Sequence, residues 1–132
     1  MKEVTIITEN RVGTLAGIAE MLGGVGINIE AISAYEHEGK AVFRLLTADP
    51  TTAKKTLEKG PGIKGISVAD VIVLKLINRP GELGKITRKL ANRGINLESL
   101  YIVSRGNEHT EVAIKPAAED VEKAREALGI RD

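Results

Sequence analysis

The chain has 132 residues, of which 42% are hydrophobic and 28% are charged, and its net charge is +1. This is the composition of an ordinary globular protein, and such a charge gives no broad attraction to nucleic acid or to an anionic membrane. The chain has no cysteine, which excludes disulfides and thiol catalysis and is typical of cytoplasmic proteins. No apolar run reaches the ~18 residues of a membrane span, and the first residues lack the features of a secretory signal. We therefore expect a cytoplasmic protein.

The chain begins with a predicted strand and a predicted helix. The β-branched run at residues 4–7 is typical of a strand. Apolar residues then recur three and four positions apart, which indicates one inward face of a helix; these residues are Leu15, Ile18, Ala19 and Leu22. The helix is expected to end in the glycines of residues 23–26, because glycine readily adopts the left-handed conformation of a C-terminal cap.

A hairpin and a second helix follow. Residues 28–35 and 41–47 are predicted to form two strands, separated by a polar turn. Asp49 and Pro50 have the chemistry of a helix N-cap and a first helical residue. A short strand near residues 66–68 completes the first half, whose expected order is βαββαβ.

The second half repeats this order. Strands are predicted at residues 70–77, 95–104 and 108–115, and Pro116 is expected to open the last helix. The two helices are recognised by their apolar spacing, which involves Leu83, Ile86 and Leu90 in the first and Val121, Ala124 and Leu128 in the second. The chain then stops, so we expect the eighth strand to be short or missing.

The two halves are related by an internal sequence repeat. Residues 10–30 align without a gap on residues 78–98, at a constant offset of 68, and ten of the twenty-one positions are identical. A fixed period decides the architecture, and two copies predict a pair of similar domains, 1–69 and 70–132. The expected fold class is α+β, with two ferredoxin-like βαββαβ units side by side and the helices on one face of each antiparallel sheet.

Units of this size are marginally stable alone, since a 60-residue domain buries only ~60% of its unfolded surface. Each would also have exposed sheet edges. We therefore expect the units to pack on each other or on another chain, and predict a homodimer.

The repeated residues place polar and glycine positions at one turn of each unit. Gly13 and Gly81 stand where each first helix begins, and glycine lets another group approach the backbone closely. The first N–H groups of a helix have no internal partner and attract negative charge, which suits a carboxylate. Asn10 and Asn78 precede these turns, where an amide either caps the helix or hydrogen-bonds a ligand. Two further asparagines open the next strand, Asn28 and Asn96.

The motif "NRPGEL", an amphipathic helix and "GINLE" resemble the ACT domain, a small-molecule sensing module of amino-acid metabolism, and the resemblance covers nearly the whole chain as two tandem copies. In that family, units join side by side and bind amino acids between the glycine turn of one unit and the second strand of the other. The resemblance implies ligand contacts at Asn10, Gly13, Thr14, Leu15, Asn28 and Ile29 in the first unit, and at Asn78, Gly81, Glu82, Leu83, Asn96 and Leu97 in the second.

The resemblance implies a regulatory protein whose ligand is an amino acid or a similar small carboxylate, and whose partner is a metabolic enzyme. Aliphatic faces at Leu15 and Leu83 favour a branched-chain or other small ligand. Glu82 replaces Thr14 in the second copy, so the two sites are not expected to be equal. The alternative is a regulatory subunit or scaffold that binds no ligand, such as the small subunit of acetohydroxyacid synthase, although that subunit has a longer C-terminal domain.

Three other classes fit the sequence less well. RNA-recognition modules of the same topology stack bases on aromatic residues, but the chain has one Phe, two Tyr and no Trp. Nucleophilic catalysis needs a nucleophile beside a base, and no such pair is evident, so we expect neither an enzyme nor a cofactor. His37 and His109 lie beside glutamates in polar hairpin turns, where one histidine does not make a closed metal site. No metal is expected.

Overall fold

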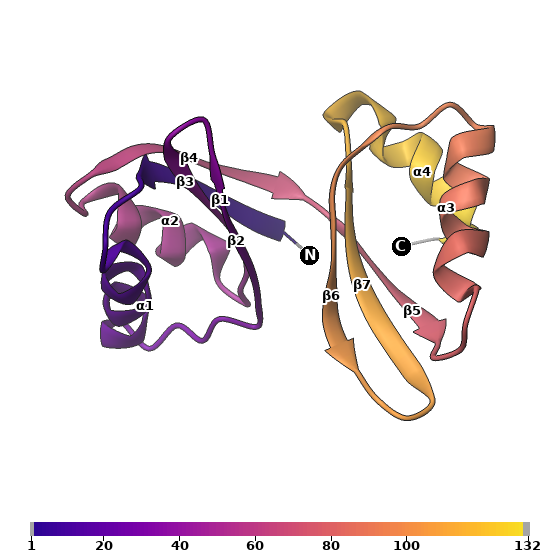
Figure 1. Ribbon diagram of the computed structural model, residues 1–132, viewed down its shortest axis with the longest axis horizontal. Coiled ribbons are helices and arrows are strands. Elements are labelled where there is room, and N and C mark those ends of the chain that lie inside the picture. The colour runs from indigo at the N-terminus through magenta and orange to yellow at the C-terminus, as the bar shows by residue number, and fades with distance from the viewer. Residues whose placement is uncertain (1, 131–132) are drawn as a thin grey trace. The chain divides into compact units, whose positions relative to one another are not determined.

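The computed structural model describes residues 2–130 and divides the chain into two compact units, Met1–Ala69 and Asp70–Asp132. Each unit contains an antiparallel sheet and two α-helices. Figure 1 shows the two units, each with its own sheet and its own helices. The predicted α+β class, with two ferredoxin-like units, is confirmed.

Unit 1 has the complete βαββαβ order. Its elements are β1 (Lys2–Glu9), α1 (Thr14–Gly24), β2 (Ala31–His37), β3 (Lys40–Leu46), α2 (Pro50–Glu58) and β4 (Ile63–Asp70). The four strands form one sheet in the order β2-β3-β1-β4. The final strand is longer than the short strand expected at residues 66–68.

The two helices of unit 1 cover the same face of this sheet (Figure 1). Alternate residues of β1 and β3 enter one core, because successive side chains of a strand point to opposite faces. The helices contribute residues at helical spacing to the same core. The buried members of this cluster are Val4, Ile6, Ile18, Leu22, Ala41, Phe43, Leu45, Ala53 and Leu57.

The direction of the strands determines which loops meet. β1 and β2 both pair antiparallel with β3, so β1 and β2 run in the same direction. In the sheet, Ile7 and Tyr35 both lie opposite Val42, one on each side. The last residues of β2 therefore lie at the same end of the sheet as the turn that follows β1.

Unit 2 repeats the arrangement with three strands among the residues described. Its elements are β5 (Ile72–Ile77), α3 (Glu82–Asn92), β6 (Leu97–Arg105), β7 (His109–Pro116), a 3-10 turn (Ala118–Asp120) and α4 (Val121–Leu128), with the sheet order β5-β7-β6. No fourth strand occurs between residues 70 and 130. The expected short strand at the end of the chain falls partly on residues 131–132, outside the described residues.

Local signals for helix termini gave one confirmed prediction and one wrong one. The Asp49 side chain caps α2 by accepting a hydrogen bond of 3.0 Å from the N–H of Thr52, with Pro50 as the first helical residue. Pro116, in contrast, does not open a helix: it ends β7 opposite Leu97 and is buried. The helix begins after an extended Ala117 and a 3-10 turn, since proline fits the end of a strand as well as the start of a helix.

Candidate functional site

The turn before α1 leaves the start of this helix without a side-chain cap. Gly13 occupies the N-cap position with φ +88°, a left-handed conformation that favours glycine. The Thr14 hydroxyl turns back and donates to the Arg11 carbonyl over 2.9 Å. A Cβ atom added at Gly13 would meet no described atom within 4 Å. The glycine is therefore required by its backbone conformation, and it faces open space.

The turn before α3 has the same backbone and a different charge. Gly81 also has φ +88°, and no side chain caps the helix. Here the first helical residue is Glu82, which pairs with Lys85 at 3.0 Å and with Arg79 at 3.0 Å. Lys85 first, and then Arg79, hold the pKa of the Glu82 carboxyl below its ordinary value. A carboxylate thus already lies at the positive end of this helix.

A hollow of 610 Å³ lies beside the unit 1 turn. It is bounded by the start of α1, the last part of β2 and the start of β3. Its lining residues are Asn10, Arg11, Gly13, Thr14, Leu15, Ala16, Ala34, Tyr35, Glu36, Ala41 and Phe43. One cation, Arg11, and one carboxylate, Glu36, therefore face a lining that is otherwise uncharged.

A smaller hollow, of 190 Å³, lies at the corresponding place in unit 2. Aliphatic side chains make up half of its lining, and Arg79, Glu82 and Arg105 bring charge to it. The complete lining is Leu76, Ile77, Asn78, Arg79, Glu82, Leu83, Ile102, Arg105, Thr110 and Val112. This hollow, like the first, combines apolar walls with groups of both charges.

The two hollows are equivalent in the repeat. At the offset of 68, five lining positions of unit 1 fall on lining positions of unit 2: Asn10 on Asn78, Arg11 on Arg79, Thr14 on Glu82, Leu15 on Leu83 and Ala34 on Ile102. The strand register adds another, because Phe43 lies opposite Ala34 and Val112 lies opposite Ile102. The repeat therefore preserves the place of the hollow and changes its walls.

Seven of the twelve residues implied by the family resemblance line these hollows, and Gly81 lies next to one of them. The other four do not: Asn28, Ile29, Asn96 and Leu97 follow the C-terminal ends of α1 and α3, whereas the hollows lie at the N-terminal ends. Asn78 has a structural bond, because its amide donates to the Gly106 carbonyl over 2.8 Å. This bond ties the turn to the β6–β7 hairpin.

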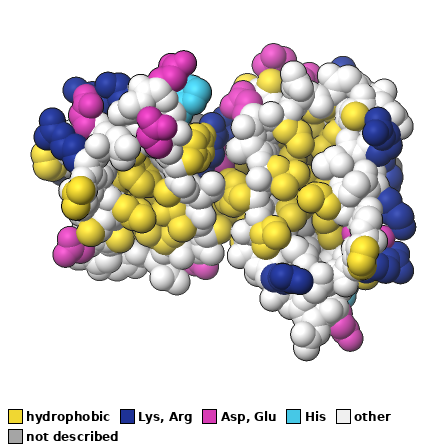
Figure 2. Space-filling view, in the orientation of Figure 1, with side chains coloured by type: hydrophobic (Ala, Val, Ile, Leu, Met, Phe, Trp, Pro, Cys, Tyr) yellow, Lys and Arg dark blue, Asp and Glu magenta, His cyan; other side chains and the backbone are white. Residues whose placement is uncertain are grey.

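The helical spacing predicted that Leu15 and Leu83 face the cores, but the structure places them beside the hollows and outside both cores. Their exposed fractions are 43% and 44%, whereas Ile18 and Leu22, farther along α1, are buried. Each leucine lies in the first turn of its helix, beyond the edge of the core. Figure 2 shows hydrophobic side chains that reach the surface in both units.

Several residues that line the hollows were not predicted as site residues from the sequence. Arg11 and Arg79 could have been predicted, because they are identical in the two copies of the repeat. Tyr35, Glu36 and Arg105 had no such signal, because they lie at the ends of β2 and β6 and join the turn only through the strand order. Their place follows from the common direction of β1 and β2, and of β5 and β6.

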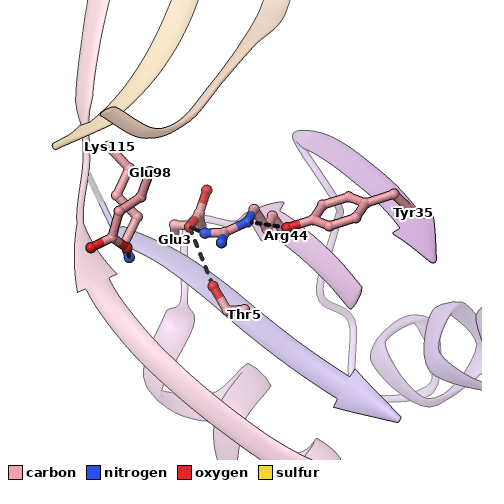
Figure 3. A network of polar contacts seen from close by, with 6 residues as sticks. All are labelled: Glu3, Thr5, Tyr35, Arg44, Glu98 and Lys115. Carbon is pink, nitrogen blue, oxygen red and sulfur yellow. Dashed lines mark hydrogen bonds and ion pairs between the residues drawn. The ribbon is translucent and has the colours of Figure 1, made fainter. Parts of the chain in front are cut away.

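A polar network on the other face of the unit 1 sheet holds Tyr35 in place (Figure 3). The Arg44 guanidinium donates to the Tyr35 hydroxyl over 3.0 Å and pairs with the buried Glu3 carboxylate at 3.0 Å. Thr5 donates to the same Glu3 oxygen over 3.3 Å. The bonds to tyrosine and glutamate outweigh burial and raise the pKa of Arg44. The Tyr35 ring is therefore held on the sheet face opposite the one that carries Ala34 and Phe43.

Figure 3 also draws Lys115 and Glu98, which form an ion pair within unit 2 between β7 and β6. Elsewhere, His37 and His109 lie at the strand ends beside the two hairpin turns. Among residues 2–130, no group of three or more His, Cys, Asp or Glu side chains is placed to hold a metal ion. No helix in this range is long and apolar enough to span a membrane.

We compared the chain with known protein families and solved structures. The model of the ACT domain pair matches residues 1–131. Protein BT0572 from Bacteroides thetaiotaomicron is similar in structure, with a TM-score of 0.84 and 29% identity over 97% of this chain and 85% of that one. The ligand-free regulatory subunit of aspartate kinase from Thermus thermophilus has a TM-score of 0.70 and 18% identity, over 97% and 90%.

The regulatory subunit of aspartate kinase from Thermus flavus is also similar, with a TM-score of 0.65 and 19% identity over 97% of this chain and 90% of that one. No curated protein sequence matches the chain. Because the family model spans both units, the chain belongs to the family of ACT domain pairs.

Proposed function

We propose that the chain is a regulatory protein that binds a free amino acid in the hollow beside each glycine turn. The observation that carries this proposal is the pair of charges at each hollow: Arg11 and Glu36 in unit 1, and Arg105 with Glu82 in unit 2. A zwitterion is recognised by groups of both signs, together with an apolar wall for its side chain. The lining of each hollow includes residues of all three kinds.

In unit 1, the α-carboxylate is bound by the start of α1 and by Arg11. The helix has no side-chain cap and no acidic residue in its first turn, so its positive end is available to an anion. Glu36 serves the ammonium group: one of its oxygens accepts the Gly39 N–H at 2.8 Å, and a carboxylate has further acceptor sites. The Asn10 amide both donates and accepts.

In unit 2, the roles of the charged groups are exchanged. Arg105 has no ion-pair partner among residues 2–130, and its guanidinium is suited to a carboxylate. Glu82 occupies the start of α3, where it disfavours a second anion and attracts the ligand ammonium. The exposed Leu83 contacts the ligand side chain from the apolar wall.

The family resemblance adds a contribution from another unit. Four of the residues implied by the resemblance follow the C-terminal end of a helix, whereas the hollow of the same unit lies at the N-terminal end: Asn28, Ile29, Asn96 and Leu97. We propose that they close the hollow of a neighbouring unit. Such closure accompanies the homodimer that the small size of each unit favours. Sedimentation equilibrium should show a dimer at micromolar concentration, and a monomer alone would contradict this part of the proposal.

Calorimetry with each of the twenty amino acids tests ligand binding by the full chain. We expect at least one to bind at millimolar concentration or below. The replacement Leu83→Ser removes an exposed wall of the unit 2 hollow and should weaken binding there by about tenfold, equivalent to ~1.4 kcal/mol. Val25→Ser is the matched control, since Val25 is 50% exposed and lines neither hollow.

Binding is proposed to act on a partner enzyme and not on chemistry within this chain. The fold is shared with proteins described as regulatory subunits of aspartate kinase. A pull-down from the host, with and without the amino acid found by calorimetry, identifies that partner. If no amino acid binds, the sensor proposal fails, and a regulatory subunit without a ligand takes its place.

A further inference from the structure

We infer that the basic face of α3, which consists of Lys85, Arg88 and Lys89, is a docking surface for an acidic helical segment of a partner protein. This inference rests on the part of the proposed function in which the chain acts on a partner protein. It needs no ligand in either hollow. It adds the place of contact on this chain and the charge of the segment that the partner presents.

The basic face is exposed and continuous. All three of its residues are exposed, and the Lys85 side chain is 65% exposed. Residues three and four positions apart are neighbours on a helix, so the three cations form one patch. The buried residues of α3 are Ile86 and Leu90, on its core side. Figure 2 shows Lys and Arg side chains gathered along the side of unit 2 that carries α3.

Few carboxylates of the chain neutralise this face. Glu82 pairs with Lys85 at 3.0 Å, but the same carboxylate also pairs with Arg79 at 3.0 Å. Arg88 and Lys89 have no ion-pair partner among residues 2–130. Like charges three and four positions apart disfavour a helix slightly. Carboxylates from a partner would therefore relieve a repulsion that the chain itself leaves in place.

The internal repeat indicates that the fold of the unit does not require the basic face. Both α1 and α3 bury an isoleucine and a leucine at equivalent positions. At the three cation positions, however, α1 carries Gly17, Glu20 and Met21. The same type of core is thus built with an outer helix face of a different charge. A contact outside the unit accounts for the cations better than packing within it does.

The chemistry of the basic face favours a protein over other anionic partners. Modules that bind single-stranded nucleic acid stack bases on aromatic side chains, and α3 has no aromatic residue. A helix that lies on a membrane inserts its apolar side into the lipid, whereas Ile86 and Leu90 are buried in the core. Cations at helical spacing match carboxylates at the same spacing on an acidic helix. Complementary charge of this kind orients a partner and speeds its association.

The experiment titrates the full chain with a synthetic helical peptide that carries glutamates three and four positions apart, and it follows the amide NMR shifts of the protein. The same peptide with glutamine in place of each glutamate is the matched probe. We expect the acidic peptide to shift the amides of α3, with an affinity that falls as the salt concentration rises. The neutral peptide should shift none of them.

Arg88→Glu reverses a charge of the basic face and should weaken binding of the acidic peptide by about fivefold or more. An exposed ion pair is worth up to about fivefold in affinity, and the reversal also adds repulsion. Lys55→Glu, at an exposed position of α2, changes the net charge of the chain equally and is the control. It should leave the affinity unchanged. Both positions are exposed, and far-UV circular dichroism confirms that both variants fold.

The outcomes separate this inference from the proposed function. The inference is overturned if the acidic peptide shifts α2 as strongly as α3, or if the two charge reversals weaken binding equally. It is also overturned if the neutral peptide binds as well as the acidic one. Tighter binding of α3 to a single-stranded oligonucleotide or to phosphatidylserine vesicles would overturn it as well. Amino-acid binding, measured by calorimetry, stands or fails independently of each of these results.

Discussion

Replacing Gly81 by alanine tests whether the turn before α3 requires glycine for its backbone alone. Gly81 has φ +88°, and an added Cβ would meet no described atom within 4 Å. No clash therefore contributes, and the cost is that of the left-handed conformation for an L-residue, ~1–2 kcal/mol. We expect Gly81→Ala to lower the free energy of unfolding by this amount.

Gly84, three residues later, is the matched control. It lies inside α3, has no positive φ and also has open space around an added Cβ. Alanine in a helix interior is favoured over glycine by about 0.5–1 kcal/mol, so Gly84→Ala should raise stability. The two variants add the same methyl group but should change the free energy of unfolding in opposite directions. The free energies of unfolding of the two variants should therefore differ by about 1.5–3 kcal/mol.

Urea unfolding followed by far-UV circular dichroism measures both variants. The same comparison is available in unit 1, where Gly13 has φ +88° and Gly17 lies inside α1. If Gly81→Ala proved as stable as Gly84→Ala, the turn would not need a left-handed residue. The shared backbone conformation of the two turns would then have no explanation in the preference of glycine for positive φ.

Two further predictions concern the core and the charged turn. Leu22→Ala should lower the free energy of unfolding of unit 1 by ~2–5 kcal/mol, because Leu22 is fully buried, whereas Val25→Ala, at an exposed position, should change urea unfolding little. The pKa of Glu82 in the folded chain lies below its ordinary value of 4.5 because of Lys85 and Arg79. Stabilisation from these ion pairs is therefore complete above the unfolded pKa and is lost as the pH falls through the folded pKa. Carbon NMR of the Glu82 carboxyl should show a titration midpoint below 4.5. In Glu82→Gln, the loss of folding stability at acidic pH should be smaller. A midpoint at the ordinary value would contradict the ion pairs.

The sequence alone was sufficient for the architecture and for the position of the turns. The repeat at a constant offset of 68 predicted two similar units, and periodicity predicted the order of strands and helices. Local chemistry identified Gly13, Gly81 and the Asp49 cap, because a glycine at positive φ or a carboxylate at a helix start depends on neighbours within a few residues. These features need no knowledge of distant contacts.

Only the tertiary structure decided which residues surround each turn. Tyr35, Glu36 and Arg105 reach the hollows because β1 and β2, like β5 and β6, run in the same direction beside a shared neighbour. This arrangement is determined by pairing between strands that are far apart in the chain. The secondary-structure propensity of a short segment therefore cannot predict it.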